Sequence, residues 1–232
     1  MILQLCTGGD LAYHLTNNEI FKENIAKFFI AEVVLAIEYI HTLDVIYRDL
    51  KPENILIDGD GHCKLADFGL AKEGIKNQTA KSFCGSPAYL APEMLSETGV
   101  GKPADVYQIG AVLYELLVGV SPFFTDNIRK LYASIQTAKL PLPSFLSREA
   151  MDLLARMLSK NPQNRITIPA IKQHPFFKEI DWAKLEAREI APPLLLQMDK
   201  SAQAEMDAEA KYLAAHSPGE QIFNDKDYDE KN

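Results

Sequence analysis

Tyr47-Arg48-Asp49-Leu50-Lys51-Pro52-Glu53-Asn54 is the most informative run of this chain, and Asp67-Phe68-Gly69 and Ala91-Pro92-Glu93 follow it in that order. Between the first two motifs lie two short β-like runs, Ile55-Leu56-Ile57 and Cys63-Lys64-Leu65-Ala66. They are joined by Asp58-Gly59-Asp60-Gly61, in which the Asp-Gly pairs are strong turn signals. The sequence therefore predicts a β-hairpin directly after the first motif.

Each motif alone has an ordinary structural explanation, since an isolated Asp-Phe-Gly is most often a turn and an isolated Arg-Asp a surface pair. Their order, with a hairpin between the first two, resembles the catalytic loop, magnesium loop and activation-segment end of a protein kinase. Tyr47 in place of the usual histidine, and the stretches at 67–76 and 82–93, resemble the AGC group near its protein kinase B and S6 kinase branch. The resemblance extends to about Pro193, where Pro192-Pro193 matches the start of the AGC C-terminal tail.

This resemblance implies roles for four polar residues. Asp49 would accept and orient the proton of the substrate hydroxyl, and Lys51 would reach the transferring phosphoryl group. Asn54 and Asp67 would ligate Mg²⁺, which prefers hard oxygen ligands. A lysine two residues after the catalytic aspartate is typical of serine/threonine kinases. We therefore expect transfer of the ATP γ-phosphate to serine or threonine.

The nucleotide site implied by the resemblance lies at the start of the chain. We expect the hinge, about residues 3–6, to bond adenine, with nucleotide contacts from Gln4, Cys6, Asp10 and Leu56. However, the 46 residues before Tyr47 contain neither a glycine-rich phosphate loop nor a strand with the phosphate-pairing lysine. The expected fold class is α+β, mainly α: a protein-kinase-like C-terminal lobe with a short β-hairpin, and the N-terminal lobe absent.

Two interpretations stay open for such a chain. The favoured one is the C-terminal part of a complete AGC kinase, because every catalytic position of the large lobe is intact. The other is a one-lobed, non-catalytic protein that binds basic peptides or a kinase partner through the preserved groove. In either case we expect no measurable phosphorylation by this chain alone, because the phosphate clamp contributes several kcal/mol to the transition state.

Substrate preference is a further expectation from the resemblance. Three carboxylates occupy positions that receive arginines upstream of the phosphoacceptor: Asp10, Glu53 and Glu115. Three apolar residues would line the pocket for the residue after it: Phe83, Pro87 and Leu90. Taken singly, each carboxylate is as readily a solvated surface charge. Ala88 replaces the common glutamate, so we expect arginine-directed but softer selectivity.

Regulation and packing are also implied. Ser82 falls at the activation-loop phosphosite and would be the target of an upstream activating kinase, with Arg48 and Lys72 available to pair with the phosphate. An ordinary loop serine is the alternative.

Three buried contacts are expected around the catalytic loop. Ser86 would link Asp49 to Lys51 through its hydroxyl. Glu93 and Arg165 would form a buried ion pair. The carboxylate of Asp105 would accept backbone hydrogen bonds from the loop.

Composition limits the other possibilities. Lys and Arg total 24 and Asp and Glu total 32, so the net charge of −8 argues against nucleic acid and is compatible with basic peptides. The chain is 47% hydrophobic, which excludes wholesale disorder. Three cysteines without a C-x-x-C pair indicate neither disulfides nor zinc and favour a reducing, cytoplasmic setting. No run of about 20 apolar residues predicts a membrane span.

Apolar spacing predicts the helices. We expect one to start after Asp10 and others at 24–42, 104–119, 150–158 and 169–172. A short strand is expected at 1–5.

The apolar pattern of the core fades beyond about Phe177. We therefore predict a kinase domain at 1–177 and a partly disordered AGC-type tail at 178–232. Within the tail we expect a helical segment at 202–215 and a solvated Ser217-Pro218.

Overall fold

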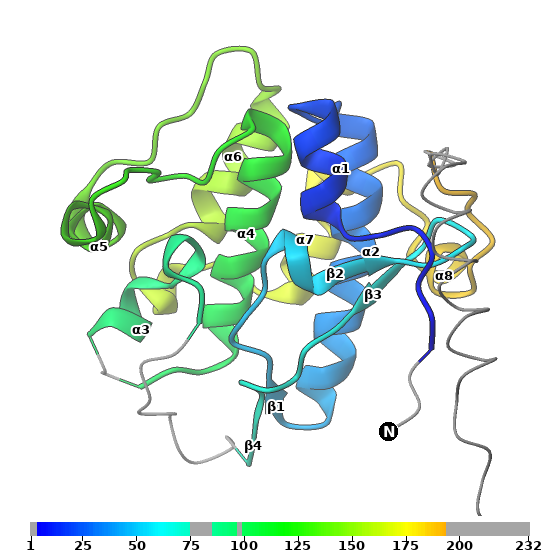
Figure 1. Ribbon diagram of the computed structural model, residues 1–232, viewed down its shortest axis with the longest axis horizontal. Coiled ribbons are helices and arrows are strands. Elements are labelled where there is room, and N and C mark those ends of the chain that lie inside the picture. Colours follow the sequence, from blue (N-terminus) through cyan, green and yellow to red (C-terminus); the bar gives the residue numbers. More distant parts are fainter. Residues whose placement is uncertain (1–3, 75–84, 97–98, 194–232) are drawn as a thin grey trace, which may run out of the picture. The chain divides into compact units, whose positions relative to one another are not determined.

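Two long helices lie side by side at the centre of the fold (Figure 1): α2 (Glu23–Thr42) and α4 (Lys102–Val118). The computed structural model describes residues 4–74, 85–96 and 99–193. Buried residues in α2 recur every three or four positions, including Ala26, Phe29, Val33 and Ile37, so that one broad face enters the core. Helix α4 is buried on most sides, as its apolar density predicts.

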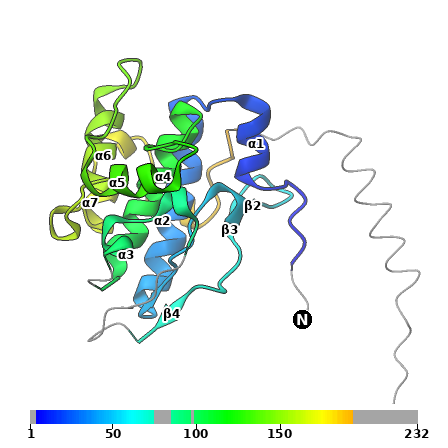
Figure 2. The ribbon, with the colours of Figure 1, turned by 60° about the vertical axis from the view of Figure 1, so that its left-hand side comes forward.

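Shorter helices surround this pair (Figure 2). Their bounds are α1 Leu11–Asn18, α3 Pro92–Leu95, α5 Ile128–Thr137, α6 Arg148–Met157, α7 Ile168–Lys172 and α8 Trp182–Glu186. Helix α6 packs on α4 at Gly110, where an added Cβ would stand 2.8 Å from the Cβ of Met157. The carboxylate of Asp10 starts α1 by accepting the Tyr13 N–H at 2.8 Å.

The strands are few, short and antiparallel. β2 (Ile55–Ile57) pairs with β3 (Cys63–Leu65), with Ile55 opposite Leu65, which confirms the predicted hairpin. β1 (Val45–Ile46) pairs with β4 (Lys72–Glu73). Strand β3 packs against α2, and α1 contacts β2, so the hairpin lies against the helical core. The fold is thus α+β and mainly α, as predicted.

The structure contains several short elements that were not predicted, and α5 and α8 are the longest helices among them. Helix α5 was not predicted, because only Leu131 and Ile135 of its residues are buried, in a small cluster with Phe123 that lies apart from the main core. Helix α8 was missed because it has only five residues, although Leu185 is buried in the main core. The predicted helices at 24–42, 104–119, 150–158 and 169–172 are all present within a few residues.

The strand predicted at 1–5 is not supported where it can be assessed. Gln4 and Leu5 belong to no strand, and Leu5 is 65% exposed, because no described segment pairs with them.

Some predictions lie outside the described residues: residues 1–3, the helical segment at 202–215, Ser217-Pro218, Ser82 and Phe83. Among the helices that the structure describes, none is long and apolar enough to cross a bilayer.

Candidate active site

The backbone of the Tyr47–Asn54 loop is held by side chains of α4. Asp105 is completely buried, and its carboxylate accepts the N–H of Tyr47 at 3.0 Å and that of Arg48 at 2.9 Å. This confirms the expected role of Asp105. One turn further along α4, the Gln108 amide accepts the Leu50 N–H at 3.2 Å and donates to the Arg48 carbonyl at 3.0 Å. Helix α4 therefore fixes the course of the loop.

Asp49 lies at the centre of a buried polar network. Its Oδ1 accepts both the N–H and the hydroxyl of Ser86, at 3.0 and 3.1 Å. The ammonium of Lys51 donates to the Ser86 hydroxyl at 3.1 Å and lies 3.5 Å from Asp49 Oδ2. The predicted link from Asp49 through Ser86 to Lys51 is therefore confirmed. Residues 35 or more positions apart in the chain meet here, at one carboxylate.

Asn54 lies beside the segment that leads into Asp67, because its backbone is hydrogen-bonded to that of Ala66. The Ala66 N–H donates to the Asn54 carbonyl at 2.9 Å, so the residue after Ala66 stands beside the loop. The Asn54 amide nitrogen donates to the Asp49 carbonyl at 2.8 Å, which leaves its carbonyl oxygen for a cation. Asp67 is exposed and has a left-handed φ of 52°, and its Oδ1 accepts the Gly69 N–H.

This pair offers one amide oxygen and one carboxylate to a metal. No group of three or more His, Cys, Asp and Glu side chains that could hold a metal occurs in the described part of the chain. Hard oxygen donors of this kind suit Mg²⁺, which commonly takes one or two protein ligands and completes its shell with phosphate oxygens and water. The donor set therefore fits Mg²⁺ bound together with a nucleotide.

The end of the activation segment returns directly onto the loop. Gly85 has φ 108°, and an added Cβ would lie 2.9 Å from the Arg48 carbonyl oxygen, so only glycine fits. Seven residues later α3 begins, and there Glu93 makes two bonds to Arg165, at 2.6 and 2.9 Å. Both side chains are almost fully buried, which confirms the expected ion pair.

Two of the four residues expected at the nucleotide, Asp10 and Leu56, meet at β2. Gly8 and Gly9 exchange backbone hydrogen bonds with Ile57, at 2.9 and 2.8 Å, and Asp10 forms a β-bridge with Leu56. This pairing brings Asp10 and Leu56 together at one edge of the hairpin. Cys6 is partly buried and Gln4 is exposed just before this turn.

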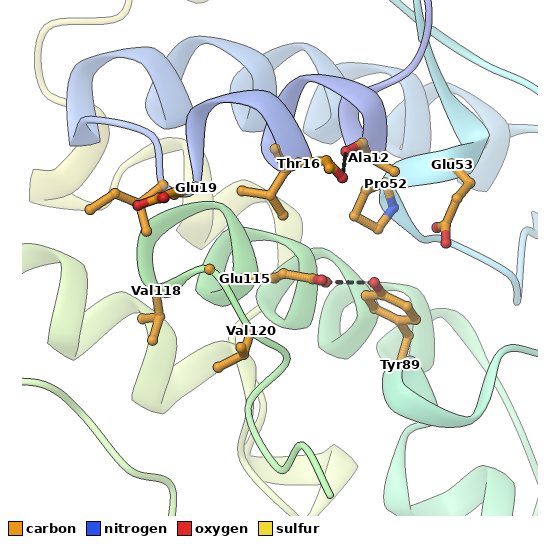
Figure 3. A pocket seen from close by; sticks show the side chains of 12 residues that line it. Ala12, Thr16, Glu19, Pro52, Glu53, Tyr89, Glu115, Val118 and Val120 are labelled. Atoms are coloured by element: carbon orange, nitrogen blue, oxygen red, sulfur yellow. Dashed lines mark hydrogen bonds between the residues drawn. The ribbon is translucent and has the colours of Figure 1, made fainter. Parts of the chain in front are cut away.

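An acidic pocket of about 620 Å³ lies between α1, the catalytic loop and the end of α4 (Figure 3). Glu53 and Glu115 both line it, and the Tyr89 hydroxyl donates to Glu115 at 2.5 Å. Burial raises the pKa of Glu115, and the nearby charge of Glu53 adds to this, while the Tyr89 hydrogen bond opposes it. The pocket therefore holds a partly desolvated negative charge that favours a cation.

The third carboxylate of this pocket was not predicted. Asp10, which was expected with Glu53 and Glu115, does not line this pocket; one of its oxygens caps α1, and its contact with a substrate stays a prediction. Glu19 also lines the pocket, at the end away from Glu53 and Tyr89 (Figure 3). Of the two described residues expected after the phosphoacceptor, Pro87 is exposed and Leu90 is fully buried.

Sequence reasoning also missed Gln108 and His41, whose Nε2 lies 2.7 Å from Asp105 Oδ2. The available signal was a polar residue inside an apolar helix: Asp105 and Gln108 are three positions apart in α4, and both are fully buried. Buried polar groups need partners, so such a pair indicates a bonded neighbour, although it does not say which one.

The chain belongs to the protein kinase family, because the family model of the protein kinase domain matches residues 1–177. Its relatives lie among the AGC-group serine/threonine kinases, as the motifs predicted. It is 44% identical to the RAC family serine/threonine-protein kinase homolog of Dictyostelium discoideum, over 87% of this chain and 46% of that protein. It is 40% identical to ribosomal protein S6 kinase beta of Caenorhabditis elegans, over 97% of this chain and 42% of the relative.

A third relative is ribosomal protein S6 kinase alpha-3 of Mus musculus, 45% identical over 83% of this chain and 27% of that protein. The chain therefore spans less than half the length of each of these three relatives.

Proposed function

We propose that this chain is the peptide- and metal-binding lobe of a serine/threonine protein kinase that phosphorylates basic peptides. The observation that carries the proposal is the network in which the Ser86 hydroxyl donates to Asp49 Oδ1 and accepts from the Lys51 ammonium, each at 3.1 Å. Such a network holds a carboxylate in one orientation, as positioning of a substrate hydroxyl requires.

In this proposal Asp49 Oδ1 is held by Ser86, and the carboxylate orients the substrate hydroxyl and takes up its proton. Lys51 stabilises negative charge on the transferring phosphoryl group, since an ammonium beside the reacting oxygens offsets the charge that develops there. Asn54 and Asp67 would hold Mg²⁺. When bound, Mg²⁺ and ATP supply the γ-phosphoryl group and screen its charge.

Basic peptides are the proposed substrates because the acidic pocket offers three carboxylates within one cavity. A guanidinium that donates to Glu115 and Glu53 together would compensate for the partial desolvation of Glu115. Glu19 extends the same negative surface to the other end of the pocket (Figure 3).

The proposed setting is the reducing cytoplasm, and Ser82 is the proposed site for an activating kinase on sequence grounds alone.

We further propose that the 232-residue chain alone transfers phosphate too slowly to measure. It contains no glycine-rich phosphate loop and no phosphate-pairing lysine before the catalytic loop. The alternative is a non-catalytic regulator that uses the acidic pocket to bind a basic peptide or a kinase.

A chimera separates these two functions. The small lobe of the mouse S6 kinase alpha-3 relative is joined before residue 4, and Mg²⁺, ATP and a serine peptide with upstream arginines are added. We expect transfer that falls at least about 100-fold in Asp49→Asn, because general base catalysis contributes 10²–10⁴-fold. Asp126→Asn, an exposed change outside the network, should keep the activity.

The chain without the added lobe should show no transfer in the same assay. Robust transfer by the chain alone that disappears in Asp67→Ala would contradict its proposed inactivity. A chimera that folds and binds both ATP and peptide but transfers nothing would refute the catalytic function and favour the regulator.

A further inference from the structure

A second pocket, of about 510 Å³, lies between the end of α4 and helix α5. Its walls come from the end of α4, the connection to α5, α5 itself and the segment that follows. The lining residues used here are Tyr114, Val120, Ser121, Phe123, Lys130 and Lys139. We call it the basic pocket, because two lysines and no carboxylate line it.

Ser121 lines this pocket, and its hydroxyl oxygen, which is almost inaccessible to solvent, has no hydrogen-bond partner in the part of the chain that the structure describes. The side chain is only 6% exposed. A buried hydroxyl without a partner costs free energy relative to water, on the order of 1–3 kcal/mol. A ligand oxygen that met this hydroxyl after a small shift of the Ser121 side chain toward the cavity would remove this cost.

The two lysines supply positive charge that no described acid neutralises. Lys130 and Lys139 are exposed, and neither forms an ion pair within residues 4–74, 85–96 and 99–193. The nearby acid Asp126 does not line the pocket. In a chain with a net charge of −8, this is a local exception that fits an anion.

A third lysine, Lys160, does not line the pocket but contacts residues of its wall. The Lys160 ammonium donates to the carbonyls of Ser134 and Ile135, at 3.2 and 2.6 Å, and stands 3.7 Å from the centre of the Phe123 ring. These contacts anchor the end of α5 and the Phe123 wall. The cavity therefore combines an apolar wall whose Phe123 ring is held by Lys160 with two exposed lysines, a combination that suits a charged side chain.

The basic pocket adjoins the acidic pocket. Val120 lines both cavities, and the consecutive α4 residues Tyr114 and Glu115 line one each. A peptide lying across Val120 would meet carboxylates on one side and ammonium groups on the other. This continuity favours a peptide over a separate small molecule as the occupant.

We propose that the basic pocket binds an acidic or phosphorylated side chain of the same peptide whose arginine enters the acidic pocket. The Ser121 hydroxyl and the ammonium groups of Lys130 and Lys139 would bond its oxygens. The proposal rests on the proposed basic-peptide function and narrows it: preferred peptides carry an arginine and, a few residues away, an anionic side chain.

The test is equilibrium binding of labelled peptides to the whole chain, measured by fluorescence anisotropy at low salt. One arginine-containing peptide is compared with a series in which each position in turn carries phosphoserine or glutamate. We expect at least one position where the anion tightens binding about tenfold, the effect of one good charge-assisted hydrogen bond. A series with no tightening at any position would overturn the proposal.

Substitutions test whether the tighter binding of the anionic peptide arises in the basic pocket. Lys130→Ala combined with Lys139→Ala should abolish the tightening and leave affinity for the arginine-only peptide unchanged. Arg129→Ala is the matched control, since this neighbour on α5 has the same charge and does not line the pocket. Tightening that survives the double substitution, or that Arg129→Ala removes equally, would also overturn the proposal.

Ser121→Ala separates binding from packing. If the hydroxyl serves the ligand, this variant loses part of the tightening although its thermal stability is raised, because a buried hydroxyl without a partner has been removed. An unchanged tightening contradicts the part of the hydroxyl in the site. A failure of the proposed basic-peptide function would give a different result. In that case the arginine would contribute nothing to peptide affinity, and Glu115→Gln would leave that affinity unchanged, whether or not the anionic side chain tightens binding.

Discussion

Asp105 shows how one buried residue organises the catalytic loop. Its two carboxylate oxygens serve the N–H groups of Tyr47 and Arg48 and the ring of His41, all within 3.0 Å. Arg48 has a left-handed φ of 71°, a conformation that a non-glycine residue adopts at a cost. The hydrogen bonds from Asp105 hold the loop in that conformation, so this residue acts on Asp49 through the backbone.

At this scale we predict that Asp105→Asn lowers the free energy of unfolding by about 2–3 kcal/mol, since an amide nitrogen would face a backbone N–H in a fully buried site. Urea denaturation followed by circular dichroism measures it. The control is Asp126→Asn, an exposed change that should stay within about 0.5 kcal/mol. Equal effects of the two variants would refute the role of Asp105.

At the scale of elements, the β2–β3 hairpin is joined to the segment after α8. Asp58 in the turn accepts the N–H groups of Asp60 and His62, at 3.1 and 3.0 Å, and its other oxygen bonds Arg188 at 3.1 Å. Burial would raise the pKa of Asp58, but the backbone N–H groups and the Arg188 guanidinium outweigh it, so the pKa lies below its ordinary value. The ionised form is therefore favoured by folding.

The lowered pKa of Asp58 sets the direction in which stability changes with pH. The stability that it adds is fully present above the pKa of the unfolded chain, about 3.9, and is lost as the pH falls through the pKa of the folded protein. We expect Asp58→Asn to be less stable at pH 7 by about 1.5–3 kcal/mol, with the difference shrinking below about pH 4. Thermal melts across pH measure it, with Asp60→Asn, an exposed change in the same turn, as the control. A pH-independent difference would contradict this account.

At the scale of the whole molecule, the charge distribution matters more than the net charge of −8. Residues from α1, the catalytic loop, the 3-10 turn at Pro87–Tyr89 and α4 meet in the acidic pocket. Burial raises the pKa of Glu115, so this carboxylate takes up a proton at a higher pH than an ordinary glutamate. Cation binding should weaken correspondingly early as the pH falls.

We therefore predict that the affinity for an arginine peptide decreases as the pH falls from 7 toward about 5, where exposed glutamates are still ionised. Glu115→Gln should bind about tenfold more weakly at pH 7, as loss of one charged hydrogen bond requires, and lose most of this pH dependence. Fluorescence anisotropy across pH measures both. Glu186→Gln, an exposed change on α8, is the control. An unaltered pH profile in Glu115→Gln would refute the prediction.

The sequence alone predicted the elements whose signal is local. Helix α2 shows its buried face in its own spacing, and the hairpin shows its turn in two Asp-Gly pairs. Helix α5 has only Leu131 and Ile135 to bury, and its partner Phe123 lies in the preceding connection, so its own residues give a weak signal. Helix α8 is too short for periodicity to identify it.

For the candidate site, too, some residues could be predicted from the sequence and others only from the structure. Motif order alone identified the kinase family and the residues Asp49, Asn54 and Asp67, because they stand at fixed short spacings within one loop and one turn. The three-dimensional arrangement was needed to find that Gln108 bonds the loop, that Glu19 lines the acidic pocket, and that Lys130 and Lys139 line one cavity with Ser121. The reason is physical: the partner of a side chain is set by which elements pack together, and residues far apart in the sequence give no local signal that they meet.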